Sequence, residues 1–119
     1  MSGLPFAACF ADTPEPPYYA VVFTSLRNGV DAEGYGEASE RMMALAVLQP
    51  GYLGAESVRD PNGVGITVSY WPTEADILGW KHQVEHAATR ARGRRDWYTR
   101  YITRVAKVER AYDWFASTP

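Results

Sequence analysis

The chain has two histidines, and both lie in one short segment beside an acidic residue. His82, Glu85 and His86 belong to the sequence HQVEH, which matches the H-x-x-E-H zinc-protease signature. Such a catalytic zinc site needs a third protein ligand and a large cleft. A chain of 119 residues has no room for these besides one core, so we expect no metal at this pair.

A histidine beside an apolar pocket could instead act as a general base. An imidazole, whose pKa lies near neutrality, can take a proton from a phenol and return it. The resulting phenolate is rich in electrons, so a dry pocket with donors for the oxyanion would suffice for oxygenation. His86 is the candidate catalytic residue. The alternative is a structural role for this histidine at a pocket or an interface.

Helical spacing distinguishes His86 from His82. His86 follows Trp80 by six residues, which places it about 240° around a helix, at about 100° per residue. His82 lies about 200° from Trp80 and is expected to point toward solvent. The apolar stripe expected to face a sheet consists of Ile77, Trp80, Val84, Ala87 and Ala88. His86 therefore lies at the border of the stripe, where it can reach both a pocket and water.

Aromatic side chains provide candidate walls for that pocket. The chain has four Trp and eight Tyr, more rings than a small core needs. We expect a cavity between the sheet and the second helix, lined by Trp80 and His86, with Phe23 or Ser25 on its floor. The candidate substrate-binding residues are Trp80, Phe23, Ser25, Trp71 and Trp97. For each ring the alternative is a place in the core.

The elements that would position these side chains follow the order strand, helix, strand, strand, helix, strand. Asp31 and Thr73 are the expected helix N-caps. Strands are expected at 18–27, 52–60, 65–71 and 101–112, and helices at 32–48 and from 73 to about 90. The order predicts an α+β, ferredoxin-like βαββαβ domain, in which a four-stranded antiparallel sheet carries helices on one face.

The other face of such a sheet needs a cover, and a second copy of the chain could provide it. We expect a proline-rich arm at 1–17, the domain at 18–114 and a C-terminal tail at 115–119. The arm and the strand at 101–112 are expected to reach the other subunit of a homodimer.

The composition of the chain limits the classes of partner that we expect it to bind. A net charge of −2 gives no indication of nucleic-acid binding. No segment approaches the roughly 20 apolar residues of a membrane span. Cys9 is the single cysteine, so no internal disulfide can form, and a cytoplasmic location is expected. A small aromatic or hydrophobic molecule is the expected ligand.

Three segments resemble the antibiotic biosynthesis monooxygenase superfamily of dimeric α+β barrels. They are QPGYLG at 49–54, ITVSYW at 66–71 and the segment from Trp80 to His86, and the resemblance extends over about 18–114. It implies a homodimer with a site between the sheet and the helices of each subunit. It also implies a range of activities: cofactor-free oxidation of phenolic polyketides to quinones, haem degradation, or action on small signalling molecules.

The haem-degrading branch of that superfamily uses an Asn on the first strand, with a Trp and a His on the second helix. Trp80 matches the Trp, but His86 lies closer to it than in that branch, and the first strand has Thr24 and Ser25 at the inward positions. We therefore expect no cofactor, with haem as the remaining candidate. The main hypothesis is a small cofactor-independent monooxygenase of a phenolic or polyketide-like aromatic. The alternatives are a non-catalytic dimeric module that binds a small hydrophobic ligand and a haem-binding or haem-degrading monooxygenase.

Overall fold

The computed structural model describes residues 9–116, so 1–8 of the expected arm and 117–119 of the expected tail lie outside the described residues. The elements are β1 (Tyr18–Arg27), α2 (Ala32–Val47), β2 (Gly54–Arg59), β3 (Val64–Trp71), α3 (Glu74–Lys81), α4 (Val84–Asp96) and β4 (Tyr98–Val108). The four strands are antiparallel, which confirms the predicted α+β, ferredoxin-like fold.

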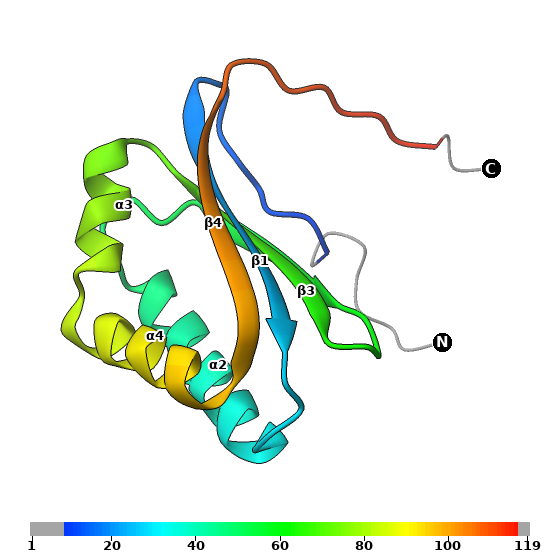
Figure 1. The fold of residues 1–119 in the computed structure, drawn as a ribbon. Coiled ribbons are helices and arrows are strands. Elements are labelled where there is room, and N and C mark those ends of the chain that lie inside the picture. The colour runs from blue at the N-terminus through cyan, green and yellow to red at the C-terminus, as the bar shows by residue number, and fades with distance from the viewer. Residues whose placement is uncertain (1–8, 117–119) are drawn as a thin grey trace.

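The sheet has the strand order β2-β3-β1-β4, so β1 is central and β4 is an edge. All three helices lie on one side of the sheet (Figure 1). The chain that leads into β1 and the chain that follows β4 run on the opposite side. Asp31 and Thr73 cap α2 and α3 as predicted, because their side chains accept hydrogen bonds from the amides of Gly34 and Asp76.

Strand alternation divides β1 into two faces. Trp71 lies opposite Tyr19 and stacks on Trp80 of α3, with ring centroids 6.4 Å apart, so Tyr19 faces the helices. Ser25 lies six residues further along β1 and shares this face. Thr24 faces the other side, so the expectation that Thr24 and Ser25 both point inward is wrong. The helix-facing residues of β1 are therefore Tyr19, Val21, Phe23 and Ser25.

Two buried tryptophans pack between the sheet and the helices, one at each end of the sheet. Trp71 is fully buried, and the rings of Tyr52 and Trp80 pack against it. Trp97 is also buried and meets the ring of Tyr35 of α2 edge-on, with centroids 5.7 Å apart. Trp71 lies near the start of β1 and Trp97 near its end, so the middle of the sheet is held less tightly.

The predicted second helix is in fact two helices, and the break lies between the histidines. His82 is the C-cap of α3, and the Gln83 side chain caps α4 by accepting a hydrogen bond from the His86 amide. His82 and His86 therefore do not share one face of a continuous helix. The break turns Val84, which is 83% exposed, and Ala88 toward solvent, so the predicted apolar stripe is wrong at these two positions.

The last strand ends earlier than predicted, at Val108 rather than at residue 112. β4 pairs only with β1, and Val108 lies opposite Tyr18, the first residue of β1. Pro16 and Pro17 come directly before Tyr18 and have no amide N–H to continue the ladder. Residues 109–116 therefore leave the sheet as an extended tail (Figure 1).

The described part of the N-terminal arm lies against its own sheet. The Ala11 amide donates to Glu56 Oε2 at 3.0 Å, and Thr13 Oγ1 donates to the Tyr18 hydroxyl at 3.1 Å. A Cβ at Gly54 would lie 2.8 Å from that of Ala11, so the arm passes directly over β2. That the arm also reaches another subunit stays a prediction.

Replacing Trp71 with alanine is expected to lower the free energy of unfolding by about 3–5 kcal/mol, because a fully buried ring is deleted. The exposed Val84→Ala change should stay within about 0.5 kcal/mol. Urea unfolding followed by circular dichroism, at one fixed protein concentration, measures both. Equal effects of the two changes would contradict the role given to Trp71.

Candidate functional site

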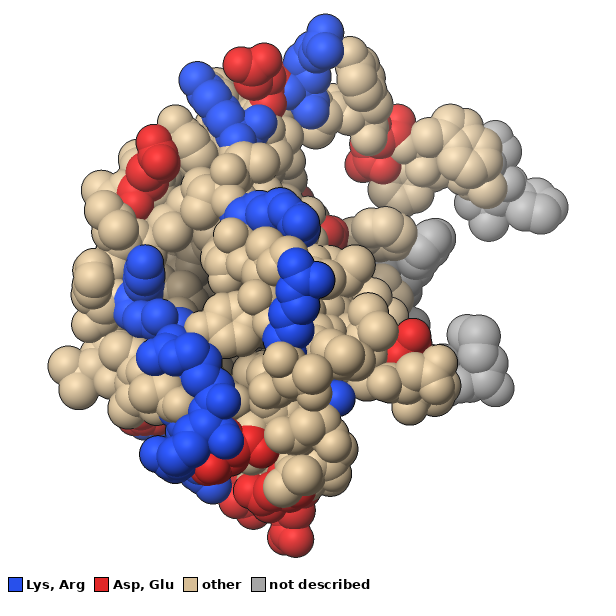
Figure 2. Space-filling view, in the orientation of Figure 1, with Lys and Arg blue, Asp and Glu red and all other residues tan. Residues whose placement is uncertain are grey.

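The helices cover the sheet only in part. Val21 and Phe23 of β1 lie opposite Ser69 and Thr67 of β3, and all four face the helices yet stay only half-buried. Figure 2 shows this side of the molecule hollowed between the helices and β4. We use the name helix–sheet cleft for this incompletely covered strip of the sheet, which is formed by Val21, Phe23, Thr67 and Ser69.

His86 and Trp80 form a parallel stack at the α3–α4 break. Their ring centroids are 3.9 Å apart with an interplanar angle of 10°. His86 Nδ1 lies 2.8 Å from the Trp80 carbonyl oxygen. Because a carbonyl can only accept, Nδ1 is the donor, and Nε2 carries the lone pair of the neutral ring. The backbone thus fixes the tautomer, and Nε2 is the basic nitrogen.

The surroundings of His86 keep its imidazole neutral. Burial lowers the pKa of His86 below its ordinary value of 6.5, the hydrogen bond to the Trp80 carbonyl opposes this, and the Arg90 cation lowers the pKa further. His86 is half-buried and His82 is exposed, as expected, although the continuous helix on which the spacing argument rested is broken between them. At neutral pH the structure therefore presents an unprotonated base.

The structure divides the predicted site residues into two groups. Trp71, Trp80 and His86 form one stack at the α3 end of the sheet. Ser25 and Trp97 lie at the other end. Ser25 is six residues beyond the partner of Trp71 on β1, which corresponds to about 20 Å of strand. One small ligand cannot touch both groups.

Phe23 lies between these groups, in a cluster with two tyrosines of β4. Its ring centroid is 5.7 Å from that of Tyr98 and 5.1 Å from that of Tyr101. Tyr98 and Tyr101 also line an open hollow of about 320 Å³, with Arg94 and Arg100 at its rim. Arg94 donates to the Tyr101 hydroxyl at 3.0 Å, so its guanidinium has a neutral partner. Lys and Arg side chains gather on the same side of the molecule (Figure 2).

A cluster beside Ser25, formed by Arg27, Arg59 and Tyr35, was not predicted from the sequence. Arg59 Nη2 donates to Ser25 Oγ at 2.9 Å and to the Tyr35 hydroxyl at 3.0 Å. The Arg27 guanidinium lies 3.8 Å from the centre of the Tyr35 ring. Each of these arginines is the last residue of its strand and faces the helices. This placement can be recognised only once the register of three strands is known.

Neither a metal cluster nor a membrane helix occurs in the part of the chain that the structure describes. Residues 9–116 contain no group of three or more His, Cys, Asp or Glu side chains that could hold a metal ion. Among the same residues, no helix is both long and apolar enough to cross a membrane.

A relative from Bacillus subtilis matches most of the chain. The uncharacterised protein YqjZ from Bacillus subtilis (strain 168) is 56% identical over 98 residues, which cover 82% of this chain and 85% of that protein. No family model matches the chain.

Solved structures share the fold at low sequence identity. A variant of SnoaB, a cofactor-independent oxygenase from Streptomyces nogalater, has a TM-score of 0.68 and 14% identity, over 79% of this chain and 95% of that chain. A Nitrosomonas europaea protein provisionally assigned as an antibiotic biosynthesis monooxygenase has a TM-score of 0.65 and 14% identity, over 83% and 94% of the two chains. Identities this low establish the fold alone.

Histidine NMR is expected to find the pKa of His86 below 6.5, with the proton of the neutral ring on Nδ1. The Arg90→Gln change removes a nearby cation and should therefore raise this pKa. Ring ¹⁵N shifts report the tautomer, and the His82→Ala variant assigns the signals. A neutral ring protonated on Nε2 would contradict the Trp80 hydrogen bond.

Proposed function

We propose that the chain, which belongs to the family of Bacillus subtilis YqjZ and shares the fold of SnoaB, is a cofactor-independent monooxygenase of a phenolic, planar aromatic substrate. The observation that carries the proposal is His86, a half-buried neutral base whose Nδ1 is held by the Trp80 carbonyl, so that Nε2 is the nitrogen left available. SnoaB, which shares the fold, is a cofactor-independent oxygenase, and this supports the reaction class.

In the proposed reaction the substrate supplies every electron. Nε2 of His86 takes the hydroxyl proton, and the phenolate passes electrons to O₂. One oxygen atom stays on the ring as a quinone carbonyl, and the other leaves as water with the hydroxyl hydrogen and the displaced ring hydrogen. Four electrons leave the substrate and four reduce O₂, so the balance needs neither a reductant nor a cofactor.

Trp80 is the positioning residue of this site. Its carbonyl holds His86 Nδ1, and its ring covers one face of the imidazole, so the direction of Nε2 is fixed from two sides. Trp71 packs behind Trp80 and is itself fully buried, which anchors the stack to the sheet. A planar substrate in the cleft would pack on Val21 and Phe23.

The reaction can be tested with a hydroxyanthrone or hydroxynaphthalene, by following oxygen uptake together with quinone absorbance. His86→Ala should lower kcat by about 10²- to 10⁴-fold, the usual contribution of a general base. The exposed His82→Ala change is the matched control and should leave the rate unchanged. Since protonation removes the base and the pKa of His86 is lowered, activity should fall only below pH 6.5.

Other outcomes of the same assay would support the alternatives. A compound that quenches tryptophan fluorescence without oxygen uptake would identify a non-catalytic module that binds small hydrophobic ligands. A one-to-one shift of the haem Soret band, lost in His86→Ala, would favour haem binding.

The proposal includes a homodimer built on the sheet face opposite the helices. Four apolar side chains of this face are between 36% and 70% exposed: Leu26, Val58, Val64 and Ile66. The tail after β4 carries three rings that are 75–89% exposed: Tyr112, Trp114 and Phe115. One copy therefore offers both a partly uncovered apolar sheet face and an exposed aromatic segment, and a second copy can bury both.

Light scattering is expected to give twice the chain mass of 13.3 kDa at micromolar concentration. Ile66→Asp places a charge on the open sheet face and should shift the mass toward that of the monomer. Val84→Asp, on the helix side, is the matched control and should leave the dimer intact. A stable monomer of the parent chain would contradict the proposal.

A further inference from the structure

Two guanidinium groups converge on one aromatic ring at the end of the sheet away from His86. Arg27 ends β1 and Arg59 ends β2, and their Cζ atoms lie 3.8 Å and 5.4 Å from the centre of the Tyr35 ring. Both side chains are half-buried. Stacking on an aromatic face favours a cation but does not neutralise its charge.

Every hydrogen-bond partner of these two arginines is neutral. Arg27 Nε and Nη2 donate to the carbonyls of Trp97 and Val30. Arg59 Nη1 donates to the Gly63 carbonyl, and its Nη2 donates to two hydroxyls. No carboxylate of residues 9–116 forms an ion pair with either guanidinium, whereas the exposed arginines 41, 92 and 95 all have such partners.

Two charges withdrawn from water without a counter-ion imply an anionic ligand. Partly buried charges are normally paired, because the loss of hydration must be offset. Arg27 Nη1 and Arg59 Nε have no acceptor among the described residues, so each fork keeps donors for a ligand. Guanidinium forks bind the oxygens of carboxylate and phosphate groups in pairs.

The sheet is shaped to hold Arg59 in this place. Its side chain leaves β2, crosses β3 at Gly65 and reaches Ser25 on β1, which is only 3% exposed. A Cβ at Gly65 would lie 2.5 Å from Arg59 Cζ, so any side chain at that position would displace the guanidinium. Three strands thus contribute to the position of one cation.

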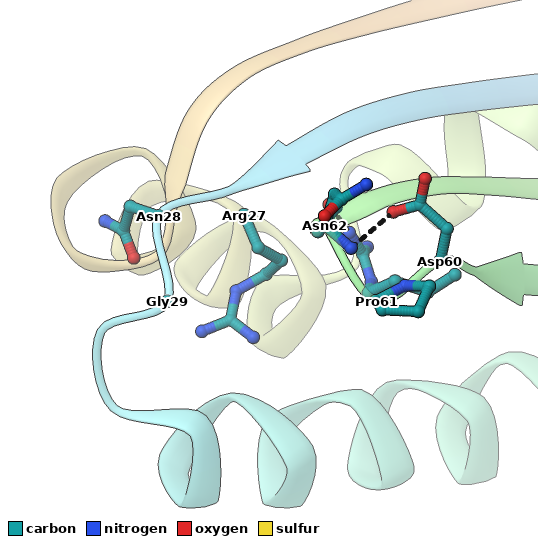
Figure 3. Close-up of a pocket in the computed structure, with 8 residues that line it drawn as sticks. Arg27, Asn28, Gly29, Asp60, Pro61 and Asn62 are labelled. Atoms are coloured by element: carbon teal, nitrogen blue, oxygen red, sulfur yellow. Dashed lines mark hydrogen bonds between the residues drawn. The ribbon is translucent and has the colours of Figure 1, made fainter.

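A hollow of about 360 Å³ adjoins the two arginines, a volume at the lower end for small-molecule sites. Arg27, Asn28 and Gly29 form one wall, and Arg59 with the hairpin 60–63 forms the other (Figure 3). Asp60 also lines it, but Asp60 Oδ1 accepts from the amides of Asn62 and Val64 and so holds the hairpin turn. Two cations against one carboxylate leave the hollow positive.

We propose that this hollow binds a small-molecule oxyanion, a carboxylate or a phosphate group, between Arg27 and Arg59. The inference does not rest on the proposed oxygenase reaction, because His86 and Trp80 lie at the opposite end of the helix–sheet cleft. The site remains as described if the chain proves to have no oxygenase activity.

Amide NMR of the full chain tests the site with inorganic phosphate and benzoate as probes, at ionic strength held constant with chloride. At least one probe should shift, saturably, the amide signals of Asn28, Gly29, Asn62 and Gly63. Arg27→Gln and Arg59→Gln should each weaken binding at least about tenfold, as expected when a charged hydrogen bond is lost. Arg95→Gln removes an exposed, already paired arginine and should leave the affinity unchanged.

Gly65→Ala is a sharper variant, because it keeps both charges and displaces only the Arg59 fork. It should weaken binding as Arg59→Gln does. If Arg59→Gln fails to fold, the proposal is tested by the affinity of Arg27→Gln and by which amide signals of the parent chain shift. A response to phosphate alone or to benzoate alone identifies the anion. No saturable shift, shifts confined to other residues, or equal losses in Arg95→Gln would overturn the proposal.

Discussion

The alternation of side chains along β1 is the constraint on which the rest of the structure depends. β1 pairs with β3 on one side and β4 on the other, so a slip of one residue would exchange its two faces. Phe23 would then leave the helix-facing side of the sheet. Tyr19 would no longer share a face with Trp71, and Arg59 would lose the hydroxyl acceptor of Ser25. Both ends of the helix-facing surface therefore depend on one central register.

The helix layer is attached at its ends rather than along its length, and this explains the open cleft. The rings of Trp71 and Trp97 are buried at opposite ends of the sheet, while the floor between them stays half-buried. A fully packed core would bury more apolar area and would be more stable. The fixed tautomer of His86, at the Trp71 end of this half-buried strip, is what distinguishes a candidate site from a packing defect.

Local sequence patterns predicted the helices and strands well. Contacts between residues that are far apart in the sequence could not be predicted in this way. The strand Tyr18–Arg27 and the cap at Asp31 follow from β-rich composition and a short polar side chain. The break at Gln83 was missed because glutamine is not a preferred N-cap, and neither proline nor glycine marks that position. The roles of Arg27 and Arg59 were missed because they require side chains from three strands and from α2 to meet.

Partial burial has different consequences for the imidazole at one end of the cleft and for the guanidinium groups at the other end. Partial burial penalises charge at both ends. His86 can respond by losing its proton, so burial lowers its pKa and leaves a neutral base. A guanidinium has no such response, because it is always a cation in proteins. The desolvation of Arg27 and Arg59 is offset by the dipoles of their hydrogen-bond acceptors, by the Tyr35 ring and, in the site that we propose, by an added anion.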